Sequence, residues 1–324
     1  MGRAKRIPYG VSDFIDIIER NQYYVDKTMY IPKLEDEPDA LFFIRPRRFG
    51  KSLFISMLRA YYDIKRKDKF DKLFGNLWIG SHPTENQGKY QVLFLDFSKI
   101  GGSIDQLEEN FNAYCNECID SFIETYQEYY PERVVESVLK AKTAARKLNA
   151  IGIAAEKKNL PLYLIVDEYD NFTNVVLNEQ GEEVYTALTH ASGFYREIFK
   201  VFKGMFSKIF MTGVSPVTLD DLTSGFNIGW HISTKPAFNQ MLGFSTEDVR
   251  GLFTYYKENG EIRPDSDVEA IIKEMKPWYD NYCFSKSALK TQSKVFNSDM
   301  VFYYLRNYRE TGEGPENMMD PNTK

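Results

Sequence analysis

The 324-residue sequence is poor in the residues that build disulfide frameworks and zinc sites. It contains only three cysteines and three histidines. Cys115 and Cys118 form a single C-x-x-C pair, but both lie within a helical pattern and the sequence has no second pair. We therefore interpret them as helix residues, and we expect neither a disulfide framework nor a zinc or redox centre.

Long apolar runs and an excess of one charge are also missing. No stretch of 18 apolar residues exists and the N-terminus lacks an apolar signal core, so we expect no membrane span and a cytoplasmic location. The 41 Lys and Arg residues are balanced by 46 Asp and Glu residues, which gives a formal net charge of −5. This balance argues against a generally basic nucleic-acid-binding protein, although local basic patches remain compatible with it.

The most informative stretch spans residues 41–58. Residues 41–44 are apolar and predict a short buried strand, and the sequence Gly50-Lys51-Ser52 then opens a predicted helix. This is the arrangement of a P-loop, in which backbone N–H groups at the helix N-terminus cradle phosphate oxygens. In this motif Lys51 reaches the β- and γ-phosphates, and Ser52 offers a hydroxyl to Mg²⁺.

The motif lacks the glycine that usually precedes Gly50 by five positions, because Arg45 stands there. Since Pro46 follows, we predict an extended backbone at Arg45 rather than a left-handed one. We expect Arg45, Arg47 and Arg48 beside the phosphate site, where they contact phosphates, bind a partner or pair with acidic residues of a lid. On these residues alone, a surface turn capped by Ser52 explains the pattern equally well.

A second motif follows about 115 residues later, where the apolar run 162–166 ends in Asp167 and Glu168. Carboxylates at the carboxyl end of a parallel strand lie where open α/β sheets bind ligands. We assign Asp167 to the Mg²⁺ shell and Glu168 to the attacking water as general base, which is the pattern of a Walker B motif. Adjacent strand residues face opposite sides, so this assignment requires the chain to turn after Asp167.

Two further apolar stretches, 90–97 and 208–212, predict strands. The second is followed by small polar residues, and Thr212 or Ser215 is a candidate sensor of the γ-phosphate; a plain strand exit is the alternative. Helices are predicted over 103–158, interrupted at Pro131, and over 182–206. Arg196 on the latter is a candidate arginine finger, although a surface arginine explains it as well.

Both ends of the sequence predict helices. Ser12 is expected to cap a helix that ends at Glu19, and Tyr24, Asp26 and Lys27 then precede the first strand, where they either pack on adenine or form a core and a turn. After residue 242 we predict three helices: one capped by Ser245, one over 268–275 and one over 299–306. They form a candidate lid or winged-helix-like module, with Trp278 and Tyr279 in its core.

Several of these segments together resemble the bacterial AAA-ATPase-like family. They are residues 24–28, 45–52, 166–170, 212–215, 278–282 and 295–297. The resemblance covers nearly the whole chain, and the run from Arg45 to Lys51 is its most specific part, since arginine at position 45 is the usual form in that family. It implies an ASCE-type α/β P-loop fold with a parallel central sheet, an additional strand between the P-loop and Walker B strands, and a helical lid.

The resemblance also implies a domain organisation. We expect an ATPase core with an N-terminal extension over residues 1–240 and the lid module over 241–324. Members of the family often continue into a PD-(D/E)XK nuclease-like domain, but no Asp…Glu-x-Lys pattern follows residue 300, so we expect that domain to be absent from this chain.

We therefore predict an Mg²⁺-dependent switch protein that binds and hydrolyses ATP. Lys51, Glu168 and Thr212 are the expected catalytic residues, and Ser52 and Asp167 the expected metal ligands. The expected nucleotide-binding residues are Asp26, Arg47, Arg48, Phe49, Gly50, Lys51, Ser52 and Leu53. Two alternatives are an ATP-binding scaffold with little turnover and a DNA-associated module that lacks its nuclease-like domain; the sequence leaves homo-oligomerisation open.

Overall fold

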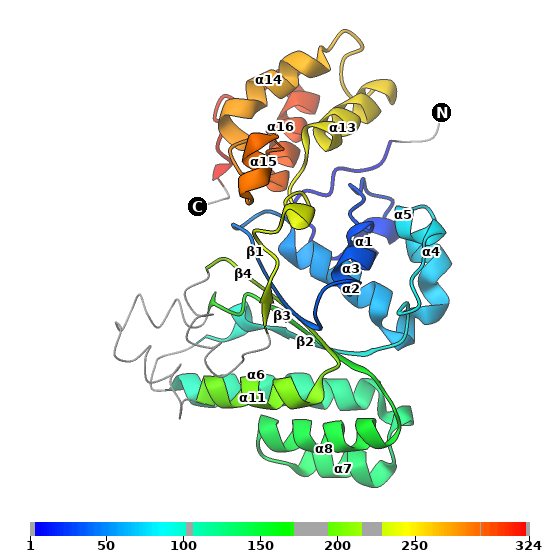
Figure 1. Ribbon diagram of the computed structural model, residues 1–324. Coiled ribbons are helices and arrows are strands. Elements are labelled where there is room, and N and C mark those ends of the chain that lie inside the picture. The colour runs from blue at the N-terminus through cyan, green and yellow to red at the C-terminus, as the bar shows by residue number, and fades with distance from the viewer. Residues whose placement is uncertain (1–3, 102–105, 172–193, 216–228, 292, 322–324) are drawn as a thin grey trace.

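A five-stranded parallel sheet forms the centre of the protein (Figure 1). The computed structural model describes residues 4–101, 106–171, 194–215, 229–291 and 293–321. The strands are β1 (Ala40–Ile44), β2 (Gln91–Asp96), β3 (Leu162–Asp167), β4 (Lys208–Gly213) and β5 (Trp230–His231), in the order β2-β3-β4-β1-β5. The prediction of an α/β fold with a parallel sheet is confirmed, and β4 is the expected additional strand between β1 and β3, the predicted P-loop and Walker B strands.

Helices cover both faces of this sheet (Figure 1). One layer consists of α1 (Phe14–Glu19), α2 (Tyr30–Glu35), α3 (Lys51–Tyr62), α4 (Phe70–Phe74) and α5 (Trp78–Ser81). The opposite layer consists of α6 (Leu107–Thr125), α7 (Glu132–Lys140), α8 (Ala144–Lys157) and α11 (Phe194–Met205). Because both faces are covered, the strands are apolar almost throughout, as buried parallel strands are.

The alternation of side chains along the strands determines which residues face α3. In β3, Leu164 and Val166 pack with α6 and α8, whereas Ile165 packs with α3. Successive strand side chains point to opposite faces, so Asp167 faces α3 as Ile165 does. Phe210 of β4 also packs with α3, which places Thr212 on the same face. The sheet thus directs both polar side chains toward the beginning of the P-loop helix.

Strand β5 is the one strand that the sequence did not predict. It contains two residues, both exposed, and it pairs with β1 through Leu41–Trp230 and Phe42–His231. A strand this short has no apolar pattern that a sequence reading detects. Its position beside β1 nevertheless makes the P-loop strand an interior strand of the sheet.

Two helix predictions need correction. The side chain that caps α1 is Asp13, which accepts a hydrogen bond from the N–H of Asp16, so the cap lies one residue after the predicted Ser12 and the helix begins at Phe14. The predicted helix over 132–158 is two helices, because Ala141 and Thr143 adopt extended backbone conformations and the chain turns so that α8 packs on α7. Of the helix predicted over 182–206, the part before Phe194 lies outside the described residues.

The C-terminal helices are α13 (Thr246–Glu258), α14 (Val268–Tyr279), α15 (Lys286–Lys290) and α16 (Ser298–Thr311). The cap at Ser245 is confirmed, as a capping box with Asp248, and helices are present at the three predicted places. α15 was not predicted. Tyr279 is buried as expected, but Trp278 is 54 % exposed, because neighbouring residues of a helix point about 100° apart and only one of them faces the core. In the described part of the chain, no helix has the length and apolarity needed to cross a membrane.

Candidate nucleotide-binding site

The loop between β1 and α3 has the backbone of an anion-binding turn. Two of its residues are in the left-handed region, Arg48 at φ 70° and Gly50 at φ 87°. Gly50 adopts this conformation without the steric cost of a Cβ, and it directly precedes the first residue of α3. It also has no side chain that caps the helix, so the N–H groups of the first turn are available to an anion. Arg45 is not among the left-handed residues, as predicted.

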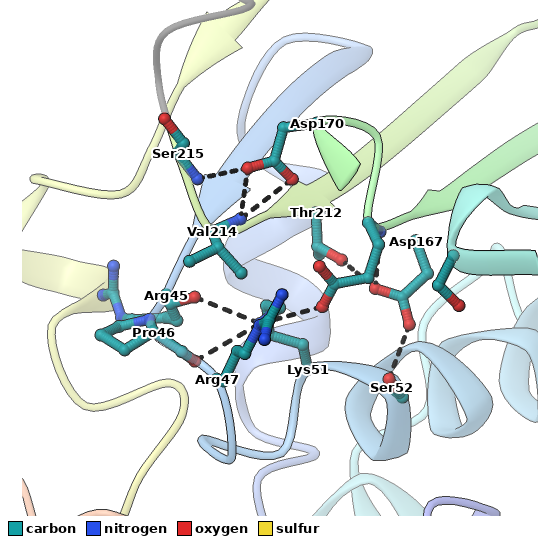
Figure 2. Close-up of polar contacts among 12 residues, drawn as sticks. Arg45, Pro46, Arg47, Lys51, Ser52, Asp167, Asp170, Thr212, Val214 and Ser215 are labelled. Carbon is teal, nitrogen blue, oxygen red and sulfur yellow. Dashed lines mark hydrogen bonds and ion pairs between the residues drawn. The ribbon is translucent and has the colours of Figure 1, made fainter. Parts of the chain in front are cut away.

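The ammonium group of Lys51 is nearly enclosed by this loop. Its Nζ donates hydrogen bonds to the carbonyl oxygens of Arg45 (3.2 Å) and Pro46 (3.3 Å), and it lies 3.3 Å from Oε1 of Glu168 (Figure 2). The residue is 5 % exposed. The lysine is therefore held in place by backbone carbonyls and by one carboxylate, at the mouth of the phosphate cradle.

Asp167 joins three elements of the site. Its carboxylate accepts hydrogen bonds from the hydroxyls of Ser52 (2.6 Å) and Thr212 (2.6 Å), and from the N–H of Glu168 (3.0 Å) (Figure 2). These donors satisfy a side chain that is only 3 % exposed and would otherwise be costly to bury. The predicted P-loop serine, Walker B aspartate and sensor threonine are thus in direct contact, although they lie on α3, β3 and β4.

Glu168 can lie beside Lys51 because strand β3 ends at Asp167. The backbone of Glu168 is left-handed, with φ 51°, so the chain turns and the alternation of the strand no longer applies. Burial raises the pKa of the Glu168 carboxyl above its ordinary value; Lys51 opposes this increase and Asp167 adds to it. The two carboxylates therefore have different environments within one site, as general bases and metal ligands do.

The segment after Glu168 is joined to the end of β4. Asp170 is fully buried, and its carboxylate accepts hydrogen bonds from the backbone N–H groups of Val214 and Ser215 (Figure 2). It lies against Gly213, where a Cβ would approach Asp170 Oδ1 to 2.4 Å, so only glycine fits there. Of the two sensor candidates, Thr212 contacts Asp167, whereas Ser215 is bound to Asp170 through its backbone.

Residues of the P-loop line two adjoining cavities. The first has a volume of about 440 Å³ and is lined by Arg47, Lys51, Ser52, Asp167 and Glu168, among others. The second is smaller, about 60 Å³, and mostly apolar. Both are also lined by the same four residues around the N-termini of α3 and α16, namely Gly50, Leu53, Ser298 and Phe302. Together they form a polar and an apolar compartment on either side of the P-loop helix.

Of the three residues singled out before the first strand, two line a cavity and one does not. Tyr24 and Lys27 line the apolar cavity. Asp26 lines neither cavity, because its carboxylate accepts hydrogen bonds from the N–H groups of Thr28 (2.8 Å) and Trp78 (2.6 Å). It stabilises a turn and the start of α5, as Asx turns do.

A model of the AAA-ATPase-like family, described as Predicted AAA-ATPase, matches residues 8–223. The chain belongs to this family. It is also 25 % identical over 303 residues to an uncharacterized protein in the vnfD 5'region of Azotobacter chroococcum mcd 1, covering 88 % of this chain and 50 % of that protein, so the chain spans about half the length of this relative. Among solved structures it is similar to the Aeropyrum pernix ORC2 protein in its ADPNP-ADP complexes, with a TM-score of 0.39 and 11 % identity over 90 % of this chain and 63 % of that chain.

This AAA-ATPase-like protein is a P-loop protein that binds ATP. The family model and the parallel sheet agree on the fold.

The three arginines of the AAA-ATPase-like P-loop do not act as one basic cluster. Arg47 lines the polar cavity, and Arg48 pairs with Asp299 of α16 at 3.1 Å. Arg45, which we expected beside the phosphate site, points away from it and is 1 % exposed. Its guanidinium instead binds backbone carbonyls on the far side of the loop. The side chain of Arg196, the candidate arginine finger, lies outside the described residues.

Phe49 and Leu53 are both placed beside the second cavity. Phe49 is 1 % exposed and packs edge-on against Tyr282, with ring centroids 4.7 Å apart. It therefore also joins the P-loop to the C-terminal part of the chain.

Sequence reasoning missed several polar residues that line the polar cavity, among them Asp96, Ser98 and Asp299. Asp96 is the register partner of Asp167 in the neighbouring strand β2. A signal was present, because Asp96 ends an apolar run in the same way as Asp167 does.

Proposed function

We propose that this AAA-ATPase-like protein hydrolyses ATP in an Mg²⁺-dependent reaction and acts as a conformational switch. The contact between the Ser52 hydroxyl and the Asp167 carboxylate, at 2.6 Å, is the observation that carries this proposal. It joins the P-loop to the Walker B strand at the point where a metal ion and the phosphates would meet. A Gly-Lys-Ser turn that served only as a surface turn would not require its serine to contact the buried Asp167 carboxylate.

The donor set fits Mg²⁺. Ser52 and Asp167 offer oxygen atoms only, which is what this hard cation prefers, and it usually takes few protein ligands because nucleotide phosphates and water complete its shell. When bound, Mg²⁺ would neutralise charge on the β- and γ-phosphates.

The chain's own residues divide the remaining work. Lys51 would bind the β- and γ-phosphate oxygens, and the N–H groups of the first turn of α3 would bind the phosphate chain. Glu168 would accept a proton from the attacking water, for which its raised pKa makes it a better base than an ordinary glutamate. Thr212, whose hydroxyl is bonded to Asp167, would align the metal ligand and read the γ-phosphate.

We propose that the apolar cavity binds the adenine of ATP. It is lined by Tyr24, Val25 and Lys27 before β1 and by Leu242 and Phe244 after it. Ligand sites of this kind combine apolar walls with a few polar groups, and Lys27 is held in position by an ion pair with Asp248 at 2.7 Å.

We also propose that residues 241–324 form a lid on an ATPase core of residues 1–240. The helices α13, α14 and α16 share a hydrophobic cluster of their own. Two contacts of residues 241–324 with the core are at the P-loop: Ser298 Oγ donates to the carbonyl of Arg48 (3.2 Å), and the N–H of Gly243 donates to the carbonyl of Phe49 (3.3 Å). A change at the phosphates would therefore reach the lid directly.

Calorimetric titration with ATP and Mg²⁺, followed by measurement of phosphate release under single-turnover conditions, tests the proposal. Lys51→Ala should remove most of the nucleotide affinity, because the phosphates lose their cationic partner. Lys72→Ala is the matched control, since that lysine is exposed and pairs only with Glu19. An unchanged affinity in Lys51→Ala would contradict the P-loop assignment. Tight binding without phosphate release would instead favour a regulatory scaffold, for which the Glu168–Lys51 contact is the supporting observation.

A further inference from the structure

Arg45 stands where a standard P-loop has its first glycine, and the structure gives its side chain a defined environment. The guanidinium lies between two aromatic rings, 4.1 Å from the centroid of Phe43 and 3.8 Å from the centroid of Phe284. The residue is 1 % exposed. Phe43 belongs to β1, whereas Phe284 lies in the segment between α14 and α15. The side chain thus joins two parts of the sequence that are about 240 residues apart.

The hydrogen bonds of the guanidinium go to backbone carbonyl groups. Nη1 donates to Ile44 (2.8 Å) and Ser233 (2.9 Å), and Nη2 donates to Phe238 (2.8 Å). Burial lowers the pKa of Arg45 to about 9, which leaves it charged at neutral pH. Burying a cation in this way is costly, and the two rings and three carbonyl acceptors offset part of that cost. The buried Nε of Arg45 has no hydrogen-bond partner among the described residues.

The backbone of the same residue is part of the phosphate site. The carbonyl oxygen of Arg45 accepts a hydrogen bond from Nζ of Lys51 at 3.2 Å, and its N–H donates to the carbonyl of Gly213 at 3.2 Å. The side chain of Arg45 therefore anchors the residue whose backbone carbonyl holds Lys51.

We infer that Arg45 is a positioning residue that sets the P-loop and Lys51 for phosphate binding by fixing the end of β1 to Ser233, Phe238 and Phe284. In a glycine-led loop the backbone shape comes from the freedom of glycine, whereas here it comes from contacts of a side chain. Residue Phe284, which lines neither of the two cavities, thereby becomes part of the phosphate-binding machinery. The inference rests on the nucleotide-binding part of the proposed function and does not require hydrolysis.

The test is the affinity for ADP, measured by calorimetry below the melting temperature of each variant as determined by circular dichroism. Arg45→Gly restores the standard P-loop pattern, yet we expect it to weaken ADP binding about tenfold or more, because small misplacements of a binding group have effects of this size. Arg45→Lys should not rescue the affinity, since an ammonium neither stacks between rings nor bridges three carbonyls. Arg133→Met, at an exposed position on α7, is the control and should bind ADP like the parent.

A second variant keeps the inference testable if Arg45→Gly does not fold. Phe284→Leu retains the hydrogen bonds of Arg45 and removes one ring, and it should weaken ADP binding severalfold. In an Arg45→Met background the same substitution should have no further effect on ADP affinity, because both residues act through one contact. Additive effects on ADP affinity would show that the two residues act independently and would contradict the inference.

Folded Arg45→Gly or Phe284→Leu protein with parental ADP affinity would overturn the inference. A parent that binds ADP but releases no phosphate from ATP would contradict the proposed hydrolysis and leave these comparisons valid.

Discussion

Glu168 Oε1 lies 3.3 Å from Nζ of Lys51. The same ammonium is the group that would bind the β- and γ-phosphates, so the Glu168 carboxylate and the nucleotide would compete for one cation. Because Lys51 is only 5 % exposed, this competition takes place in an environment with little screening by water. The first prediction follows from this relationship.

Glu168→Gln should have opposite effects on binding and on chemistry. Loss of a general base typically slows hydrolysis by about 10²- to 10⁴-fold. The substitution also removes the negative charge that competes for Lys51, so ADP should bind severalfold tighter. ADP is the ligand to measure because it is not hydrolysed, so a higher affinity cannot come from unreacted ATP that accumulates on the variant. Single-turnover hydrolysis and ADP calorimetry measure the two effects separately. Hydrolysis at the parental rate would refute the base assignment, and unchanged or weaker ADP binding would refute the competition.

The pH dependence of hydrolysis should reflect the raised pKa of Glu168. The base must be deprotonated, and burial raises its pKa by favouring the protonated form, so the rate should begin to fall at a higher pH than the ordinary pKa of a glutamate would give. Single-turnover rates with saturating ATP and Mg²⁺, measured from neutral to acidic pH, would show this acid limb. A rate that stays constant until the pH approaches the ordinary pKa of a glutamate would contradict the prediction.

Asp167→Asn should weaken binding only where Mg²⁺ contributes to it. The substitution keeps the size of the side chain and removes its charge, so the Ser52 and Thr212 hydroxyls retain one acceptor. We expect ADP affinity without Mg²⁺ to change little and the gain in ATP affinity on adding Mg²⁺ to be largely lost. Titrations with and without the metal test this, and an undiminished gain would exclude Asp167 from the metal shell.

Gly213→Ala should destabilise the fold. The new Cβ would lie 2.4 Å from Asp170 Oδ1 and 2.6 Å from Cε1 of Tyr169, both parts of buried side chains. Overpacking of this kind costs about 1–3 kcal/mol of unfolding free energy. Gly251→Ala is the matched control, because nothing lies within 4 Å of its Cβ in the middle of α13, and there alanine should stabilise by up to about 1 kcal/mol. Urea denaturation of both variants gives the comparison, and equal stabilities would show that the contact at Gly213 relaxes easily.

The core of the site was predictable because its signals are local. Gly50-Lys51-Ser52 before a helix and a buried strand ending in Asp167 each follow from apolar runs and turn residues. The contact between them follows from the parallel sheet, since strand ends meet at one edge. The same reasoning applied to β2 would have found Asp96.

Other features depend on contacts that a local pattern does not contain. The direction of the Arg45 side chain is determined by Phe284, far away in the sequence, and the sequence alone placed the guanidinium with its arginine neighbours. Asp26 is of a residue type that often binds ligands, but its hydrogen bonds are those of a turn. A carboxylate is suited to both roles, and only its surroundings decide between them.

Strand β5 has a consequence for how this protein is divided experimentally. The family model ends at residue 223, before Trp230 and His231 pair with β1 and before Gly243 binds the carbonyl of Phe49. A fragment cut at that limit would leave β1 with an unpaired edge along the strand that leads into the P-loop, and exposed strand edges promote association between chains. A sequence-defined boundary and a boundary that the chain tolerates are therefore different here, and fragments for expression should extend past the residues that close the sheet.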